Sequence, residues 1–125
     1  QVLKRMARDL AMPIEIVGMP TIREPDGLAM SSRNRYLSPQ ERKIAIAMYR
    51  ELTALAAKVR DGRTPCAKAV AESTQALCAA GFDKVEYFDV VDAESLAQIE
   101  CVAGPARIAA AARLGRTRLI DNVAV

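Results

Sequence analysis

The fold is decided by residues 38–62, SPQERKIAIAMYRELTALAAKVRDG, which combine a helix start, an apolar face and a helix end. Ser38 is suited to cap the first turn, Pro39 takes the first helical position, and Glu41 completes a capping box. Apolar side chains follow at helical intervals and form one face: Ile44, Met48, Leu52, Leu55 and Val59. Gly62 then ends the helix. The stretch predicts a long helix that packs its apolar face against a neighbouring layer.

The chain after this helix changes from helical to strand-like patterning. Thr64-Pro65 begins a second helix, which Gly81 ends. Residues 85–91 read as a strand, and residues 92–99 as a short helix or turn. Residues 106–114 and 117–123 flank Gly115-Arg116, a two-residue connection typical of a β-hairpin. We therefore expect an α+β fold, with a small antiparallel three-stranded sheet covered by two helices.

The chain before residue 20 is patterned differently. Residues 1–11 carry apolar side chains at helical spacing, and Pro13 ends that pattern. The β-branched run at residues 14–18 then predicts a short buried strand. A helix followed by a strand is half of a βαβ unit, so we expect the chain to begin inside a parallel α/β domain whose earlier strands are not in this chain. A strand of that kind needs neighbours to cover both of its faces.

Composition excludes several classes of site. The chain of 125 residues contains no histidine and no tryptophan, so it has no histidine-based triad and no histidine metal ligand. The three cysteines, Cys66, Cys78 and Cys101, are widely spaced and form no CxxC pair, which argues against a disulfide framework or a zinc site. Charged residues interrupt every apolar run, and we predict neither a signal peptide nor a membrane span. A reduced, cytoplasmic setting fits these features.

Charge is distributed unevenly along the chain. Residues 1–65 carry twelve lysines and arginines against seven acidic residues, whereas residues 66–125 carry six against eight. The positive excess lies in the half that contains residues 20–37, PTIREPDGLAMSSRNRYL. It is compatible with an anionic ligand there, or with an ordinary solvated surface of mixed sign.

The polar run Met30-Ser31-Ser32-Arg33-Asn34 follows a turn at Asp26-Gly27. Two hydroxyls, a guanidinium and a carboxamide lie side by side, and such groups are suited to donate hydrogen bonds to phosphate oxygens. The alternative is an ordinary polar loop in which serine and asparagine satisfy turns. The run lacks the glycine-rich pattern of a P-loop, so its residues leave both readings open.

Other polar residues are weaker candidates. Asp89 and Asp92 end a predicted strand, where carboxylates usually cap turns or face solvent rather than bind a metal. Asp121-Asn122 lies within a strand-like run, and we predict a buried structural pair that ties the hairpin to a helix. Cys66 and Cys78 lie on one helical face and are predicted to be packing residues.

The hairpin tip is basic, because Arg113, Arg116 and Arg118 flank Gly115. Three charges without interleaved aromatic side chains are a poor signal for nucleic-acid binding, and we expect no nucleic-acid partner.

The run REPDGLAMSSRNRYLSPQER, residues 23–42, resembles the signature of the pantothenate synthetase (pantoate–β-alanine ligase) family. The resemblance extends over the whole chain. Residues 14–18 with Pro20 are similar to the strand before the family's loop. YFDVVDA at residues 87–93 and AAARLGRTRLIDN at residues 110–122 are similar to its later strand and its C-terminal hairpin. The chain resembles the family's C-terminal domain with the end of its N-terminal domain.

The resemblance implies an ATP-dependent ligation in which pantoate is converted to pantoyl adenylate and β-alanine then displaces AMP. Met30 to Asn34 takes the position of the KMSKS-like loop of this nucleotidyltransferase class. Ser31, Ser32 and Arg33 are then expected to hold the ATP phosphates as catalytic groups. The main chain of Met30 joins them, and Ile22 contributes main-chain contacts toward the adenine.

The same resemblance implies a division of the chain into three parts. Residues 1–19 are the last helix and strand of the N-terminal Rossmann-like nucleotidyltransferase domain, residues 20–37 are a hinge with the KMSKS-like loop, and residues 38–125 are a C-terminal lid domain. The hinge is expected over Pro20–Gly27. The family's histidines, its pantoate and β-alanine residues and the ligands of Mg²⁺ are expected outside this chain, so we expect the isolated chain to be inactive. Homodimerisation of the full-length protein is also implied.

Two alternatives remain at the level of sequence. One is the lid domain of another nucleotidyltransferase of the same class, and the other is a non-catalytic interaction module.

Overall fold

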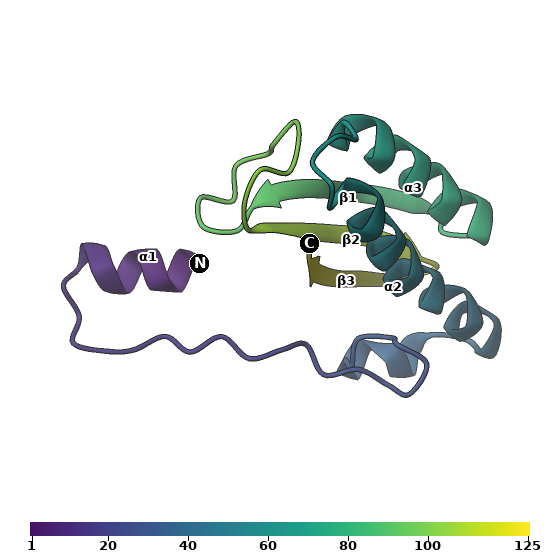
Figure 1. The fold of residues 1–125 in the computed structure, drawn as a ribbon. Helices are drawn as coiled ribbons and strands as arrows, with labels where there is room; N and C mark the ends of the chain where they lie inside the picture. The colour runs from purple at the N-terminus through teal and green to yellow at the C-terminus, as the bar shows by residue number, and fades with distance from the viewer.

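A computed structural model describes all residues from 1 to 125. Its body is a three-stranded antiparallel sheet in the order β1-β2-β3, formed by β1 (Lys84–Asp92), β2 (Ala106–Leu114) and β3 (Thr117–Ala124). Two helices, α2 (Pro39–Val59) and α3 (Cys66–Ala80), cover one face of this sheet (Figure 1). The predicted α+β arrangement of two helices on a small antiparallel sheet is confirmed.

Helix α2 begins as its sequence predicts. The Ser38 hydroxyl oxygen accepts a hydrogen bond from the Glu41 N–H (3.2 Å), and the Glu41 carboxylate accepts one from the Ser38 N–H (2.7 Å). These two bonds satisfy N–H groups that would otherwise lack partners at the helix start. The apolar face is buried against the sheet and α3, with Leu52 and Leu55 fully inaccessible to solvent.

Glycine sets two of the boundaries in the body. Gly81 ends α3 at φ +112°, a left-handed conformation that side chains with a Cβ rarely adopt. Gly115, at φ +55°, is the first residue of the two-residue hairpin between β2 and β3. Both boundaries agree with those expected from the sequence.

Strand β2 is the centre of the sheet and is rich in alanine. Ala110 and Ala112 face the helices and are fully buried, which allows the helical layer to approach closely. Ala110 pairs with Phe88 of β1 on one side and with Asp121 of β3 on the other. Alternate residues of the same strand, including Arg107 and Arg113, point to the opposite face, which no helix of the body covers (Figure 1).

The N-terminal part lies apart from this body. Helix α1 (Val2–Asp9) lies beyond the end of the sheet toward which β1 points, and the extended segment after it runs back below the sheet (Figure 1). The predicted strand at residues 14–18 is not formed. The segment is extended, but no other strand of this chain lies beside it, and a parallel strand requires such neighbours for its hydrogen bonds. Its side chains are largely exposed, including those of Ile14 and Val17.

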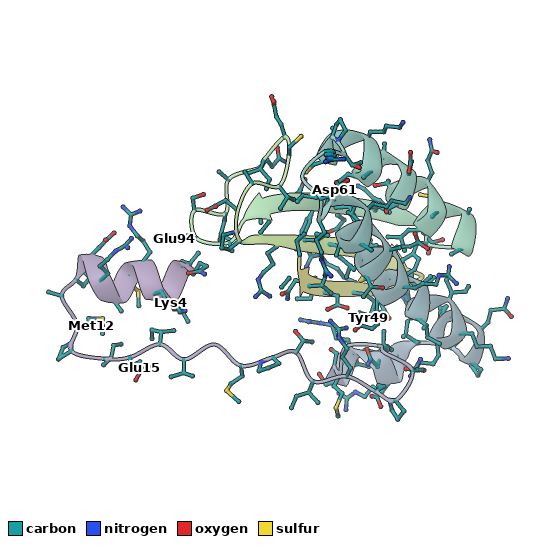
Figure 2. The ribbon with its side chains drawn as sticks, in the orientation of Figure 1. Lys4, Met12, Glu15, Tyr49, Asp61 and Glu94 are labelled. Carbon is teal, nitrogen blue, oxygen red and sulfur yellow. The ribbon has the colours of Figure 1, made fainter.

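Residues 92–99 form turns rather than a helix. The Asp92 carboxylate accepts hydrogen bonds from the N–H groups of Glu94 and Ser95, and this fixes the turn after β1. The same loop contacts α1, because the Gln1 side chain donates to the Ala93 carbonyl (2.6 Å). Figure 2 shows Glu94 on this loop, near the end of α1 that carries Lys4.

Candidate functional site

A cleft of about 680 Å³ lies between the loop at residues 28–34, the uncovered face of the sheet and the extended segment at residues 16–21. Met30, Ser31 and Arg33 line it from the loop, while Arg107 and Asn122 line it from the sheet. The cleft therefore brings the polar run of the loop together with side chains that lie far away in the sequence.

The polar run forms a tight turn. Ser31 caps the short 3-10 helix η1 (Ser32–Tyr36), because its hydroxyl oxygen accepts a hydrogen bond from the Arg33 N–H (3.2 Å). Ser31, Ser32 and Arg33 are all exposed. The Ser32 hydroxyl and the Arg33 guanidinium make no hydrogen bond or ion pair with the rest of the protein. These donors are therefore free to bind an anion.

The predicted contact residues Ile22 and Met30 lie together at the base of this turn. The Met30 N–H donates to the Ile22 carbonyl oxygen (2.9 Å), next to a bridge between Arg23 and Ala29. The Met30 N–H is thus already occupied. Its carbonyl oxygen and the N–H of Ile22 make no backbone hydrogen bond, so these are the main-chain groups left for a ligand.

Three side chains that lie far apart in the sequence form a cluster that holds the loop to the body. Arg23 donates two hydrogen bonds to Asp121 of β3, at 2.6 and 2.9 Å, and a third to the Gly27 carbonyl at 3.0 Å. Its guanidinium carbon lies 3.8 Å from the ring centroid of Tyr49 on α2. We call Arg23, Tyr49 and Asp121 the Arg23 latch. Tyr49 is labelled in Figure 2, where α2 passes over the loop.

Arg23 and Asp121 of the latch form an ion pair that is largely shielded from solvent. The Asp121 side chain is 3% exposed and that of Arg23 is 17% exposed. Hydrogen bonding to Asp121 raises the pKa of Arg23 above its ordinary value, against the opposing effect of burial. Bidentate arginine–carboxylate pairs are both strong and directional, so this contact fixes the loop in orientation as well as in place.

Asn34 closes the turn from the other side. Its side-chain N–H₂ donates to the Ala29 carbonyl (3.0 Å), while its Oδ1 atom is buried without a hydrogen-bond partner. The asparagine of the polar run therefore holds the turn in shape and leaves one acceptor unsatisfied beside the cleft.

The structure corrects one prediction about Asp121 and Asn122. Asp121 is buried as expected, but its partner is Arg23 of the loop and not a helix. The two residues are 98 positions apart in the chain, and neither the periodicity nor the local composition gives a signal for such a contact.

The remaining candidates have structural roles or face solvent. Asp92 caps a turn, as predicted, and Asp89 accepts a hydrogen bond from the Gln98 side chain. At the hairpin tip, Arg113 and Arg118 both pair with Glu86, at 2.8 and 2.6 Å, so they are not a free basic patch.

The two helical cysteines have different surroundings. Cys66 is buried as predicted, and burial raises the pKa of its thiol. Cys78 is exposed, so its predicted packing role is wrong, because its side chain lies at the solvent-facing edge of α3.

No group of three or more aspartate, glutamate, histidine or cysteine side chains lies close enough together to hold a metal ion. This chain therefore offers no cluster of carboxylates that would hold Mg²⁺ by itself. No helix is both long and apolar enough to cross a membrane.

The family profile and two proteins similar in sequence point to the same family. The sequence profile of the family described as Pantoate-beta-alanine ligase matches residues 1–124. The chain is 52% identical to the pantothenate synthetase of Paramagnetospirillum magneticum over 124 residues, which are 99% of this chain and 43% of that protein. It is also 52% identical to the pantothenate synthetase of Rhizorhabdus wittichii, covering 44% of that protein.

Solved structures are similar in fold as well as sequence. The pantothenate synthetase of Thermus thermophilus superposes with a TM-score of 0.86 at 43% identity, over 98% of this chain and 44% of that one. The pantoate-beta-alanine ligase of Francisella tularensis, crystallised with beta-gamma ATP and beta-alanine, has a TM-score of 0.63 at 26% identity, over 98% and 38% of the two chains. The chain thus spans less than half the length of the relatives it matches.

Proposed function

Because this chain belongs to the pantoate–beta-alanine ligase family, we propose that it is the C-terminal lid of an enzyme that uses ATP to condense pantoate with β-alanine. Residues 38–125 form the lid, residues 20–37 connect it, and residues 1–19 belong to the preceding nucleotide-binding domain. The observation that carries this proposal is the turn Met30–Asn34. It presents the Ser31 hydroxyl and the unpaired Arg33 guanidinium to a cleft, from a loop that Arg23 ties to Asp121 of the body.

The proposed reaction has two steps. The pantoate carboxylate attacks the α-phosphorus of ATP, and the bond to pyrophosphate breaks. The amine of β-alanine then attacks the acyl carbon of pantoyl adenylate, loses a proton, and displaces AMP. Negative charge builds on the pyrophosphate oxygens during the first step, so donors already oriented toward those oxygens lower its barrier.

In this proposal, Arg33 binds the β- and γ-phosphate oxygens with its planar fork, and the hydroxyls of Ser31 and Ser32 donate to the same phosphates. Arginine suits this role because it remains charged and presents two parallel N–H groups. The free Ile22 N–H and Met30 carbonyl oxygen lie behind the turn, where the adenosine end of ATP is expected. These groups position the nucleotide and carry out no bond-making themselves.

Mg²⁺ supplies charge neutralisation at the phosphates in reactions of this type. No cluster of three or more ligating side chains lies in this chain, and the proposal assigns the protein ligands of the metal, and the pantoate and β-alanine contacts, to the rest of the enzyme. A homodimeric full-length enzyme in the cytoplasm is part of the same proposal.

The family match over residues 1–124 favours this function over a lid from a different nucleotidyltransferase or a non-catalytic module. At the hairpin tip, the pairing of Arg113 and Arg118 with Glu86 leaves Arg116 as the one arginine without an ion pair, which argues against a polyanion site there.

The test compares the isolated chain with a composite ligase, in which this chain replaces the matching C-terminal residues of the P. magneticum protein. We expect pantothenate formation from ATP, pantoate and β-alanine by the composite ligase and none by the isolated chain. A folded composite ligase without turnover, or clear turnover by the isolated chain, would contradict the proposal. Circular dichroism of the composite ligase is the check on folding.

A further inference from the structure

The Arg23 latch joins three parts of the molecule at one guanidinium. Arg23 comes from the loop, Tyr49 from α2 and Asp121 from β3, and the Asn122 carbonyl accepts a further hydrogen bond from Arg23 at 3.3 Å. Every element that touches this guanidinium other than the loop belongs to the lid. The cluster therefore ties the loop to the lid and not to the N-terminal segment.

The connection from the latch to the nucleotide turn is short and stiff. Arg23 bridges to Ala29, with hydrogen bonds from Glu24 N–H to Leu28 and from Met30 N–H to Ile22. The Leu28 side chain is 4% exposed and packs in the hydrophobic core. Beyond it, Asp26 pairs with Arg42 of α2 at 2.7 Å. Displacing the turn relative to the lid would require breaking these contacts together.

The segment upstream has no such restraints. Between residues 15 and 21 no backbone N–H or carbonyl group makes a backbone hydrogen bond, and all side chains but that of Ile16 are exposed. Gly18 has no atoms within 4 Å of the position a Cβ would take. The loose part of the connection therefore ends where the latch begins.

We propose that Arg23 and Asp121 are positioning residues. They lock the nucleotide turn Met30–Asn34 to the lid, so that turn and lid move as one body about residues 15–21. This rests on the proposed function of the turn. It moves the hinge from the expected Pro20–Gly27 upstream to residues 15–21. A lid that closes on ATP then delivers Ser31, Ser32 and Arg33 in a fixed geometry.

The mechanical part of the proposal is tested on the 125-residue chain by amide hydrogen exchange. Asp121→Asn keeps the shape of the side chain and removes the charge that orients Arg23. The Leu28 N–H donates to the Asp26 side chain (3.3 Å) and the Met30 N–H to the Ile22 carbonyl, both within the latched loop. We therefore expect the Leu28 and Met30 amides to exchange at least about tenfold faster. Core amides of α2 and β2 should change much less. Arg23→Lys, which keeps the charge and loses the fork, should give a smaller effect in the same direction.

The matched control is Lys58→Gln. Lys58 pairs with Glu72 at 2.9 Å between α2 and α3, an exposed ion pair away from the loop. It should leave the Leu28 and Met30 amides unchanged. Equal acceleration of amide exchange in the loop and in the core of Asp121→Asn would contradict the proposal that Arg23 and Asp121 hold the loop to the lid. No acceleration in either Asp121→Asn or Arg23→Lys would contradict it as well.

The functional part is tested in the composite ligase. With Asp121→Asn we expect the KM for ATP to rise about tenfold while the KM for β-alanine stays within twofold. Loss of folded protein alone would lower kcat and leave both KM values unchanged, so that result would overturn a positioning role.

The two proposals fail in different ways. Amide exchange in the isolated chain involves no ATP, so its result tests the mechanical role of the Arg23 latch independently of the nucleotide role of the turn. A loop that opens in Asp121→Asn while kcat/KM for ATP stays within twofold of the parent in both Asp121→Asn and Arg33→Ala would overturn the nucleotide role of the turn.

Discussion

The Met30 N–H donates a hydrogen bond of 2.9 Å to the carbonyl oxygen of Ile22, so these two residues of the proposed nucleotide site lie side by side on neighbouring stretches of the loop. Ile22 directly follows residues 15–21, which make no backbone hydrogen bonds, and Met30 begins the exposed turn. A movement of one is therefore transmitted to the other through a main-chain contact. We therefore expect the free Ile22 N–H and the donors of the turn to move as one unit.

Gly27 is required where the loop passes Tyr49. Its φ is +94°, and a Cβ at this position would lie 2.5 Å from Cδ1 of the Tyr49 ring. We predict that Gly27→Ala lowers the free energy of unfolding by about 2 kcal/mol through backbone strain and steric overlap. Urea unfolding of the parent and of Gly27→Ala measures this difference in the free energy of unfolding. Gly104→Ala is the control, because nothing lies within 4 Å of its Cβ position; equal effects of the two substitutions would contradict the account.

The three thiols should differ in reactivity. Cys66 is buried, and burial raises the pKa of its thiol, whereas Cys78 and Cys101 are exposed. Since the thiolate is the reactive form, we predict that a disulfide reagent at about pH 8 modifies two thiols quickly and Cys66 only after denaturation. Cys66→Ser should leave the fast phase unchanged. Three fast thiols in the folded protein would show that Cys66 is not shielded.

Stability should fall in acid. Hydrogen bonding from Arg118 lowers the pKa of Glu86, and hydrogen bonds from Ser38 lower the pKa of Glu41. The folded state therefore binds fewer protons than the unfolded state near these pKa values. The stabilisation is present at neutral pH and is lost as the pH falls below about 5.

The urea midpoint at pH 7 and at pH 3 measures this effect, and we expect the lower midpoint at pH 3. In Glu86→Gln the difference between the two midpoints should be smaller. A midpoint that stays constant or rises in acid would contradict the ionisation states described.

Much of the body could be predicted from the sequence because its signals are local. Ser38, Pro39 and Glu41 are adjacent and define the start of α2, and Gly115 marks the hairpin. The polar run at residues 30–34 is likewise identified as a candidate site by its composition.

The rest depends on contacts that local patterns do not encode. Arg23 and Asp121 lie 98 positions apart, so their pairing becomes visible only when β3 is placed beside the loop. The strand expected at residues 14–18 has the composition of a strand but no neighbour in this chain to pair with. Periodicity reports which residues prefer an extended conformation, and it does not report whether a partner is present.

The most direct measurement of the central claim is the kinetics of Arg33→Ala in the composite ligase with ATP as the varied substrate. Arg33 is exposed and unpaired, so its removal should leave the fold intact. We predict a loss of about 100-fold to 1,000-fold in kcat/KM for ATP, as expected for one donor that stabilises developing charge. Arg60→Ala, an exposed arginine at the far end of α2, should stay within twofold of the parent. An Arg33→Ala ligase within twofold of the parent would contradict the assignment of the turn to the ATP phosphates.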